Sequence, residues 1–228
     1  MALDAYTKSL LHFDGANDSQ VFTDMSGKVW TAAADAKLKT ATKKFGASSA
    51  YFDGTGDHIS TPDHVDFTVG SGDYTVDFWF NAVGTTGSAI FYGQSDAAGN
   101  SSSQSIIGRF LATNQLSAEF SNGSASLVAY SPTVTVTDGV WHHYAAIRYG
   151  NNLYCAIDGT LGVALSVTGQ SVNDSSTIFC IGTMGLKTTN DYTGYIDEFR
   201  FSKGIARWTT NFTPPSRPYG FTPQIIIY

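Results

Sequence analysis

Residues 139–159 constrain the fold more than any other part of the chain, because they have the pattern of two strands joined by a tight turn. From Trp141 to Tyr149, two sets of side chains alternate with the period of two that a β-strand imposes. Gly150 and the two asparagines after it tolerate the positive φ of a hairpin turn, and Asp158-Gly159 turns the chain again. The expected hairpin buries Trp141, His143, Leu153, Cys155 and Ile157 and exposes Arg148 and Asp158.

Composition favours an all-β chain. The 228 residues include 23 glycines and only two glutamates, so strand and turn formers outnumber helix formers. This length suits one β-sandwich and is too short for two comfortable ones. Gly-Ser-rich segments such as 95–105 and 121–126 have loop length and lie between strand-like runs, which is typical of loops and not of domain linkers. The one segment with the pattern of a helical turn is 202–208, where Ser202 would be the cap.

Charge and hydropathy exclude two classes of partner. The formal net charge of −6 argues against nucleic acid, because phosphate binding requires clustered Lys and Arg. No apolar run approaches the roughly 20 residues of a membrane-spanning helix, so we expect no membrane insertion. The N-terminus lacks the basic-then-apolar layout of a secretory signal. We therefore expect either that a signal segment has been removed or that the protein reaches the exterior by another route.

Six further segments follow the order of a known family. They are Leu10–Gly15 (LLHFDG), Thr23–Gly27 (TDMSG), Phe45–Ile59 (FGASSAYFDGTGDHI), Gly70–Phe80 (GSGDYTVDFWF), Gly194–Lys203 (GYIDEFRFSK) and Ala206–Pro215 (ARWTTNFTPP). With the hairpin, they resemble the laminin-G-like jelly rolls of the concanavalin A-like lectin and glucanase superfamily. The last segment resembles the closing segment that this family shows most often in bacteriophage virion proteins. The resemblance implies an all-β fold, a two-sheet antiparallel β-sandwich or jelly roll over residues 1–219, followed by an apolar tail at 220–228.

The resemblance also implies a structural calcium ion. In several branches of the superfamily such an ion joins the first strand to the last through an acidic residue on each. Asp14 and Asp197 occupy the corresponding places, and Asp24 in the TDMSG turn would add a ligand. The alternative is ordinary turn chemistry, in which Asp14 and Asp24 accept local backbone amides and Asp197 pairs with Arg200 or Lys203.

Catalytic patterns are absent from the sequence. The glucanase branch carries Glu-x-Asp-x-x-Glu on one strand, and this chain has no such acid pair. Glu119 stands alone, Glu198 is expected at a rim or in solvent, and Asp77 is expected to be a polar, outward side chain. No Gly-x-Ser-x-Gly motif accompanies the five histidines. His142 and His143 do not form a zinc chelate, because adjacent strand residues face opposite ways. We therefore expect no enzymatic activity.

Aromatic residues make up 14% of the chain and offer flat apolar faces to sugar rings. Packing within strands explains most of them, Trp79 and Trp141 included. Those near loops or turns are the candidates for a glycan-binding surface: Tyr92, Tyr130, Tyr149, Tyr192 and Trp208.

The C-terminal tail ends in an apolar run, and the two cysteines share strand faces with apolar neighbours. The run either packs back on its own domain or adds an edge strand to a neighbouring subunit. Cys155 and Cys180 are expected as free core thiols. The residues expected at the subunit contact are Ile225, Ile226, Ile227 and Tyr228.

Together these features predict a non-enzymatic protein of the bacteriophage virion, acting in capsid decoration or in a tail or fibre. We expect it to form homo-oligomers and to bind other virion proteins or host surface glycans. The alternative is a carbohydrate-binding module or a glycoside-active enzyme domain.

Overall fold

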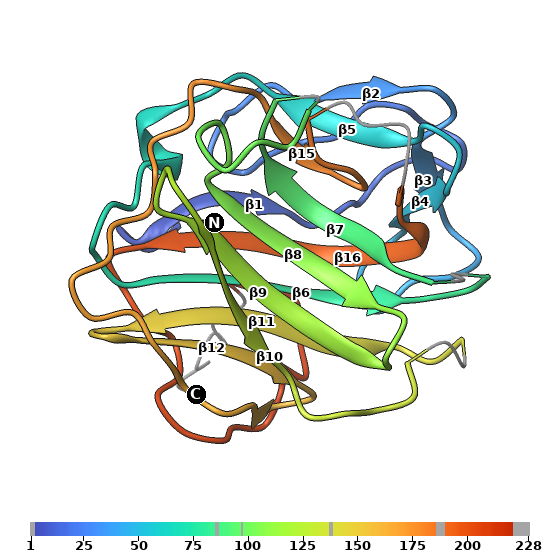
Figure 1. The fold of residues 1–228 in the computed structure, drawn as a ribbon. Coiled ribbons are helices and arrows are strands. Elements are labelled where there is room, and N and C mark those ends of the chain that lie inside the picture. Colours follow the sequence, from blue (N-terminus) through green and yellow to red (C-terminus); the bar gives the residue numbers. More distant parts are fainter. Residues whose placement is uncertain (1–2, 85–86, 97, 137–138, 186–189, 221–228) are drawn as a thin grey trace, which may run out of the picture.

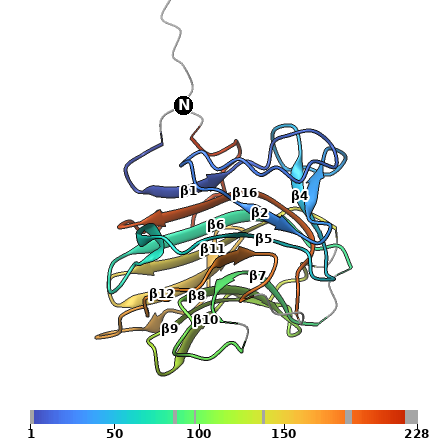
Figure 2. The ribbon, with the colours of Figure 1, turned by 90° about the horizontal axis from the view of Figure 1, so that it is seen from above.

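The computed structural model describes residues 3–84, 87–96, 98–136, 139–185 and 190–220, which form two antiparallel sheets packed face to face (Figures 1 and 2). The predicted all-β sandwich is therefore confirmed. The nine-stranded sheet has the order β13 (Thr160–Leu161), β12 (Asn152–Ile157), β11 (His142–Tyr149), β6 (Tyr74–Asn81), β16 (Thr193–Lys203), β4 (Ser49–Asp53) and β3 (Lys37–Lys39), with β1 (Thr7–Leu11) paired to β16 and β14 (Leu165–Ser166) paired to β12. The seven-stranded sheet has the order β10 (Ser126–Tyr130), β9 (Gln115–Ser121), β8 (Ile106–Leu111), β7 (Ala89–Gln94), β15 (Phe179–Ile181), β5 (His58–Thr61) and β2 (Thr31–Ala33).

Helix is confined to one 3₁₀ turn among the described residues, η1 (Val65–Phe67). No helix in this part of the chain has the length and apolar character needed to cross a membrane. The helical turn expected at 202–208 is absent, because β16 continues to Lys203 and Gly204 then takes a φ of 83°. That glycine starts the segment that later forms the candidate site.

Aromatic rings fill the space between the sheets. Phe78 of β6 stacks on Tyr144 of β11 at a centroid distance of 4.8 Å and on Phe199 of β16 at 5.7 Å. From the opposite sheet, Phe91 of β7 lies 5.3 Å from Phe78, and Phe179 of β15 lies 6.2 Å from Phe199. All five rings are fully buried, and each buried ring stabilises the fold by roughly 1.5–3 kcal/mol.

The predicted hairpin is present as β11 and β12, with Tyr149 opposite Asn152 at its turn. His143, Leu153, Cys155 and Ile157 are buried and Asp158 is exposed, as expected. The prediction that Trp141 is buried is wrong, because this residue precedes the first residue of β11 and is only half-buried. Cys155 and Cys180 are free and buried, also as expected.

The prediction that Arg148 is exposed is wrong. Its side chain is 2% exposed and lies on the inner face of the sheet. Nη1 donates to the carbonyl of Gly70 at 3.0 Å and Nη2 to the carbonyl of Gln170 at 2.6 Å. The guanidinium also lies 5.5 Å from the ring centroid of Phe120. Because loop carbonyls accept hydrogen bonds from its guanidinium, this arginine is buried at the end of the sandwich without an acidic partner.

A β-bulge in β16 sets the chemistry of the outer face of the nine-stranded sheet. Opposite β6, Asp197 pairs with Trp79 and Arg200 pairs with Asp77, so β16 has one extra residue between them. Glu198 takes a φ of 55° at this point. The bulge shifts the alternation and brings two consecutive carboxylates to the outer face.

The same outer face is covered by the segment that follows β16, residues 205–220, which we call the C-terminal strap. Arg207 N donates to Thr75 Oγ1 at 3.0 Å, and Phe212 N donates to the carbonyl of Gly159 at 2.8 Å. Trp208 and Phe212 pack against the apolar side chains that β11 and β12 direct outward. Both faces of β11 are therefore buried, the inner one by the core and the outer one by the strap.

Candidate functional site

Under the strap lies a buried ion pair. Asp77 is 0% exposed, and Arg200 donates to it through Nε at 3.0 Å and Nη2 at 2.8 Å. Burial by itself raises the pKa of Asp77, but the guanidinium of Arg200 and the imidazole of His143 outweigh it and hold the pKa well below its usual range. Asp77 points away from the core, as expected for an outward side chain, but the strap covers it and keeps it from solvent.

His143 links this ion pair to the strap. Its Nε2 lies 3.0 Å from the hydroxyl of Tyr219 and 3.7 Å from Oδ2 of Asp77. Burial lowers the pKa of His143, and the Asp77 carboxylate opposes that shift only in part. The imidazole is therefore neutral, and its contact with Asp77 is not an ion pair.

A second carboxylate fixes the other end of Tyr219. Glu198 accepts from the backbone N–H of Tyr219 at 2.8 Å and bonds Nδ1 of His12 at 2.9 Å. The hydrogen bond to Glu198 raises the pKa of His12 against the opposing effect of burial. Glu198 is almost fully buried, so its expected place at a solvent rim is also wrong. Its side chain serves instead to hold the end of the strap.

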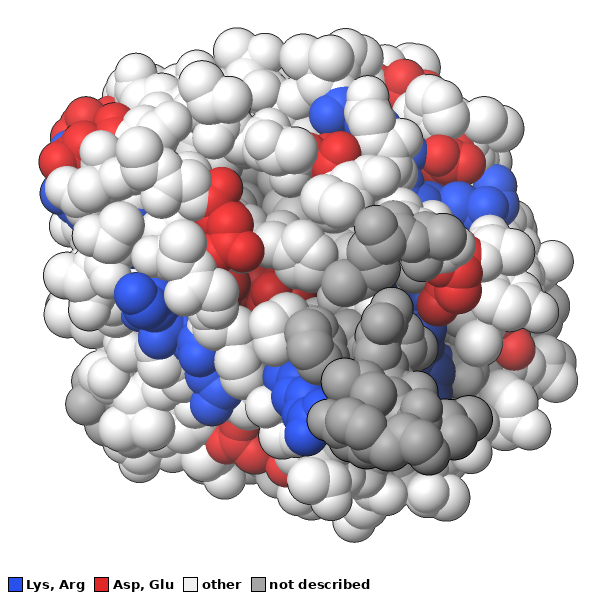
Figure 3. Space-filling model, turned by 180° about the vertical axis from the view of Figure 1, so that it is seen from behind, with Lys and Arg blue, Asp and Glu red and all other residues white. Residues whose placement is uncertain are grey.

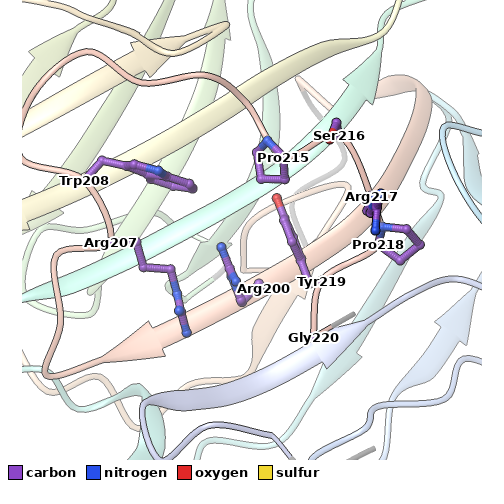
Figure 4. Close-up of a pocket in the computed structure, with 9 residues that line it drawn as sticks. All are labelled: Arg200, Arg207, Trp208, Pro215, Ser216, Arg217, Pro218, Tyr219 and Gly220. Atoms are coloured by element: carbon purple, nitrogen blue, oxygen red, sulfur yellow. The ribbon is translucent and has the colours of Figure 1, made fainter. Parts of the chain in front are cut away.

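Above this network the strap leaves a pocket of about 510 Å³, which we call the Arg–Trp pocket. Figure 4 shows Trp208 on one side, Pro215, Arg217 and Pro218 on the other, and Arg200 and Tyr219 between them. The guanidinium of Arg200 lies 3.9 Å from the ring centroid of Tyr219. The lining residues are Arg200, Arg207, Trp208, Pro215, Ser216, Arg217, Pro218, Tyr219 and Gly220.

The aromatic side of the pocket is held rigid. Trp208 stacks on Phe212 with the centroids 3.9 Å apart and the rings 8° from parallel, and Phe212 is itself fixed by its backbone bond to Gly159. Both rings also contact the edge of His143. The pocket therefore combines a fixed indole, a tyrosine and guanidinium donors, which are groups that recognise sugar rings and acidic groups.

A family model described as the concanavalin A-like lectin/glucanases superfamily matches residues 53–207. The chain belongs to this superfamily. The match includes Asp77, His143 and Arg200 and ends at Arg207, so most of the strap lies beyond it. No curated protein sequence matches this superfamily member.

Solved structures with the same fold include binding domains. One is domain 4 of AbnA, a GH43 extracellular arabinanase from Geobacillus stearothermophilus, which was solved in complex with arabinotriose. It is 18% identical with a TM-score of 0.62, and the match covers 88% of this chain and 94% of that chain. The binding domain of Paraclostridial Mosquitocidal Protein 1 is 11% identical, with a TM-score of 0.69, 88% of this chain and 49% of that chain covered.

A third neighbour is the binding domain of botulinum neurotoxin DC in complex with rat synaptotagmin II. It is 10% identical, with a TM-score of 0.64, 90% of this chain and 50% of that chain covered. This superfamily member thus spans about half the length of the two toxin binding domains and nearly all of the arabinanase domain. At these identities the similarity shows the fold alone.

The aromatic residues predicted for glycan binding separate into two groups. Trp208 lines the Arg–Trp pocket, Tyr130 lines a second pocket of about 670 Å³ beside residues 161–165, and Tyr149 is half exposed at the β11–β12 turn. Tyr92 and Tyr192 are buried in the core, so their expected surface position is wrong. Both lie next to loops in sequence, but their rings point between the sheets.

Sequence reasoning missed Tyr219, Arg200 and Arg207 as parts of the site. Tyr219 lies in a proline-rich segment beyond the last recognisable strand, and no periodicity marks its position. Arg200 lies within β16 and Arg207 follows it, and in sequence both resemble ordinary outward-facing residues. A cue was available in the cluster of aromatic, basic and proline residues between 207 and 219.

Of the predicted calcium ligands, Asp24 does not fit. Its Oδ1 accepts from the backbone N–H of Ser26 at 2.6 Å and of Leu10 at 3.2 Å. Its Oδ2 accepts from Ser9 Oγ at 2.6 Å and Trp30 Nε1 at 3.0 Å. Both oxygens already have two donors, so Asp24 stabilises the junction of β1 with its turn.

Asp14 and Asp197 fit a cation better. Asp197 Oδ2 accepts from the backbone N–H groups of Lys44 at 2.7 Å and Phe45 at 3.0 Å, while Oδ1 is buried without a partner among the described residues. Burial raises the pKa of Asp197 to about 8, and the charges of Glu198 and Asp14 add to the shift. Asp14 accepts from Ala47 N in the same loop.

If calcium binds here, Asp14 and Asp197 would supply its carboxylate ligands. Within the described ranges, no group of three His, Cys, Asp or Glu residues is placed to hold a metal. The alternative pairing of Asp197 with Arg200 or Lys203 is wrong, because Arg200 bonds Asp77 and Lys203 Nζ donates to the carbonyl of Val65 at 2.8 Å. Calcium binding stays a prediction, now for Asp14 and Asp197.

The residues predicted for the subunit contact, Ile225, Ile226, Ile227 and Tyr228, lie outside the described residues. The isolated acid Glu119 is engaged by Arg109 Nε at 3.0 Å and Ser117 Oγ at 2.6 Å. Like Asp77 and Glu198, it is bound to partners within the protein.

Proposed function

We propose that this chain is a non-enzymatic binding module that attaches to carbohydrate through the Arg–Trp pocket. The observation that carries the proposal is the fixed Trp208 indole, which faces guanidinium donors in a pocket of about 510 Å³. Sugar recognition uses such a combination, because the ring face packs on an aromatic surface while the hydroxyls bond fixed polar groups. Preorganisation by the buried network below the pocket lowers the entropic cost of binding.

The comparisons support a binding role. The arabinanase domain, which this chain matches over nearly its full length, was solved with arabinotriose. The toxin neighbours are binding domains, one of them solved with rat synaptotagmin II. Engagement of Asp77, Glu198 and Glu119 by internal partners favours binding over glycoside hydrolysis, which needs two carboxylic acids aimed at one linkage.

The finer proposal is that the module belongs to a bacteriophage virion and binds host surface glycans or neighbouring virion proteins. Its support is the resemblance of residues 206–215 to the closing segment of phage virion proteins. Those residues form the strap and supply Trp208 and Pro215 to the pocket. Mass spectrometry of purified particles tests this placement directly, and the proposal fails if the chain is missing from them.

The binding function is tested by titrating a panel of oligosaccharides into the chain and two variants by calorimetry. Trp208→Ala is expected to abolish binding, because it removes the aromatic wall of the pocket. Tyr149→Ala removes an exposed aromatic residue elsewhere and is the matched control, expected to bind normally. If Tyr130→Ala abolishes binding and Trp208→Ala does not, the site is the second pocket. If no oligosaccharide binds, the proposed function is wrong.

A further inference from the structure

We infer that the Arg–Trp pocket selects an acidic saccharide, one whose ring carries a carboxylate or a sulfate. This inference rests on the proposed function and names its ligand class. It starts from the lining residues, which include three arginines and no Asp or Glu. In a chain of net charge −6, a pocket lined only by basic and uncharged residues is a local reversal of charge.

The guanidinium groups are held in place by partners behind the pocket. Arg200 donates hydrogen bonds to Asp77 through Nε and Nη2. Arg207 donates to Ser202 through Nε and to Asp4 and Thr7 through Nη2. Each guanidinium therefore has a fixed plane, so little side-chain entropy remains to be lost when a ligand binds.

Donors remain for a ligand on both groups. Nη1 of Arg200 and Nη1 of Arg207 make no hydrogen bond to any residue that the structure describes, and neither atom is among the buried unpartnered ones. Both side chains keep a small exposed fraction, 12% for Arg200 and 13% for Arg207. The exposed Arg217 adds a third guanidinium at the rim.

These donors favour an anion over a neutral hydroxyl. A guanidinium group donates planar, charge-assisted hydrogen bonds that match carboxylate and sulfate oxygens, and such bonds are about twice as strong as neutral ones. Asp77 and Asp4 neutralise part of the charge of Arg200 and Arg207, so the selectivity comes from the directed N–H groups of these two arginines more than from a long-range field. Trp208, Pro215 and Pro218 supply apolar surface for the ring.

The shape of the surface disfavours a nucleic-acid ligand. Figure 3, the view from behind, shows positive and negative side chains interspersed on the visible face and not a continuous basic stripe. Polyphosphate backbones require such a stripe because each contact releases counterions. A single acidic sugar in an open surface pocket needs only two or three placed donors.

The test uses matched pairs of sugars with the full chain. Oligogalacturonate against oligogalactose probes the carboxylate, and dextran sulfate against dextran probes the sulfate. We expect at least one acidic member to bind at least about tenfold tighter than its neutral counterpart, the range of one charge-assisted hydrogen bond. Raising the salt concentration should weaken binding of the acidic sugar and leave binding of its neutral counterpart unchanged.

Variants then locate the effect. Arg207→Gln and Arg217→Gln should each weaken binding of the acidic sugar more than binding of its neutral counterpart, and so reduce the preference for the acidic sugar. Lys43→Gln makes the same change of charge at an exposed lysine outside the pocket and should change nothing. Thermal melting confirms that each variant is folded, and Arg217, exposed at the rim, keeps the test valid if Arg207→Gln is unstable.

Three outcomes overturn the inference, and the first two separate its failure from that of the proposed function. Equal affinity for acidic and neutral members of both pairs, with both lost in Trp208→Ala, refutes acid selection and leaves the proposed carbohydrate function standing. No binding by any of the four sugars or by the wider oligosaccharide panel refutes both. A preference that survives Arg207→Gln, Arg217→Gln and the double variant also places the anion outside this pocket.

Discussion

Asp77 and Arg200 face each other across β6 and β16 and join through two parallel hydrogen bonds of 3.0 and 2.8 Å beneath the C-terminal strap. The pair is buried on a sheet face that, in a sandwich, usually contacts water. Residues 205–220 cover that face and so bury the pair, which is connected to Tyr219 of the strap through His143.

Removing one member of this pair should strongly destabilise the protein. Asp77→Asn leaves a buried guanidinium without its counter-charge and is expected to cost about 3–5 kcal/mol of unfolding free energy. The double variant Asp77→Leu with Arg200→Met should cost much less, because it leaves no uncompensated charge. Urea unfolding measures both. Equal losses in the single and double variants would show that packing, not charge, dominates here.

Because the pKa of Asp77 is depressed, its stabilisation is present at neutral pH and is lost as pH falls below the range of an ordinary aspartate.

His12 should make stability depend on pH in the opposite direction. Its pKa is raised by Glu198, so the folded state binds a proton more tightly than the unfolded state. The resulting stabilisation is complete below a pH of about 6.5, the ordinary histidine pKa, and is lost as pH rises through the folded value. Melting temperatures of wild type and His12→Gln between pH 5.5 and 8.5 test this. The difference between them should narrow at high pH, and a constant difference would contradict the assignment.

Calcium is predicted to bind Asp14 and Asp197 and to raise the melting temperature. An ion that binds only the folded state stabilises it by about 2.7 kcal/mol at a hundredfold excess over its dissociation constant. Addition of chelator should lower the melting temperature of wild type and have no effect on Asp197→Asn. Asp24→Asn is the control, since its loss of hydrogen bonds should destabilise the protein while sensitivity to chelator remains. A wild type indifferent to chelator rules the ion out.

Gly159 should be required for the strap to close. A Cβ there would lie 1.8 Å from the carbonyl oxygen of Phe212, at a φ of 80°. Gly169 has a φ of 73°, and a Cβ added there would have no atom within 4 Å, so Gly169→Ala carries the backbone strain alone. We expect Gly159→Ala to lower the unfolding free energy by more than about 1 kcal/mol beyond the loss caused by Gly169→Ala. We also expect it to change the fluorescence of Trp208. Equal effects would mean that the strap moves aside without cost.

The tail beyond Gly220 is predicted to hold subunits together. Burial of Ile225, Ile226, Ile227 and Tyr228 on a neighbour would contribute several kcal/mol, at roughly 1.5–3 kcal/mol for each side chain before entropy is subtracted. Light scattering should therefore show an oligomer for the full chain and a monomer for a version ending at Gly220. Monomers in both cases would remove the sequence support for assembly.

The sequence predicted the strands well, because their alternation is a local property of the chain. Leu153, Cys155 and Ile157 lie on the core face as their spacing requires. What could not be predicted was burial of the opposite face. Asp77 and Glu198 have the spacing of exposed residues, and only a segment from the far end of the chain covers them.

The site was predictable only in part for the same reason. Trp208 was identified because the sequence alone shows an aromatic residue next to a predicted loop. Arg200 and Tyr219 form the pocket through contacts that join residues 77, 143, 200 and 219, and no local pattern encodes those contacts. The bulge at Glu198 also breaks the alternation from which a face would have been assigned.

The position of β16 has a consequence for how the protein is made. This strand pairs with β6 on one side and with β4 and β1 on the other, so the last strand of the described residues lies near the middle of its sheet. During synthesis, β1, β4 and β6 leave the ribosome with exposed, unpaired edges until residues 193–203 emerge. Such edges are prone to pair with other nascent chains. Completion of the nine-stranded sheet therefore depends on long-range pairing, which is slow, and a chain truncated before residue 193 would lack the strand that joins β6 to β4 and β1.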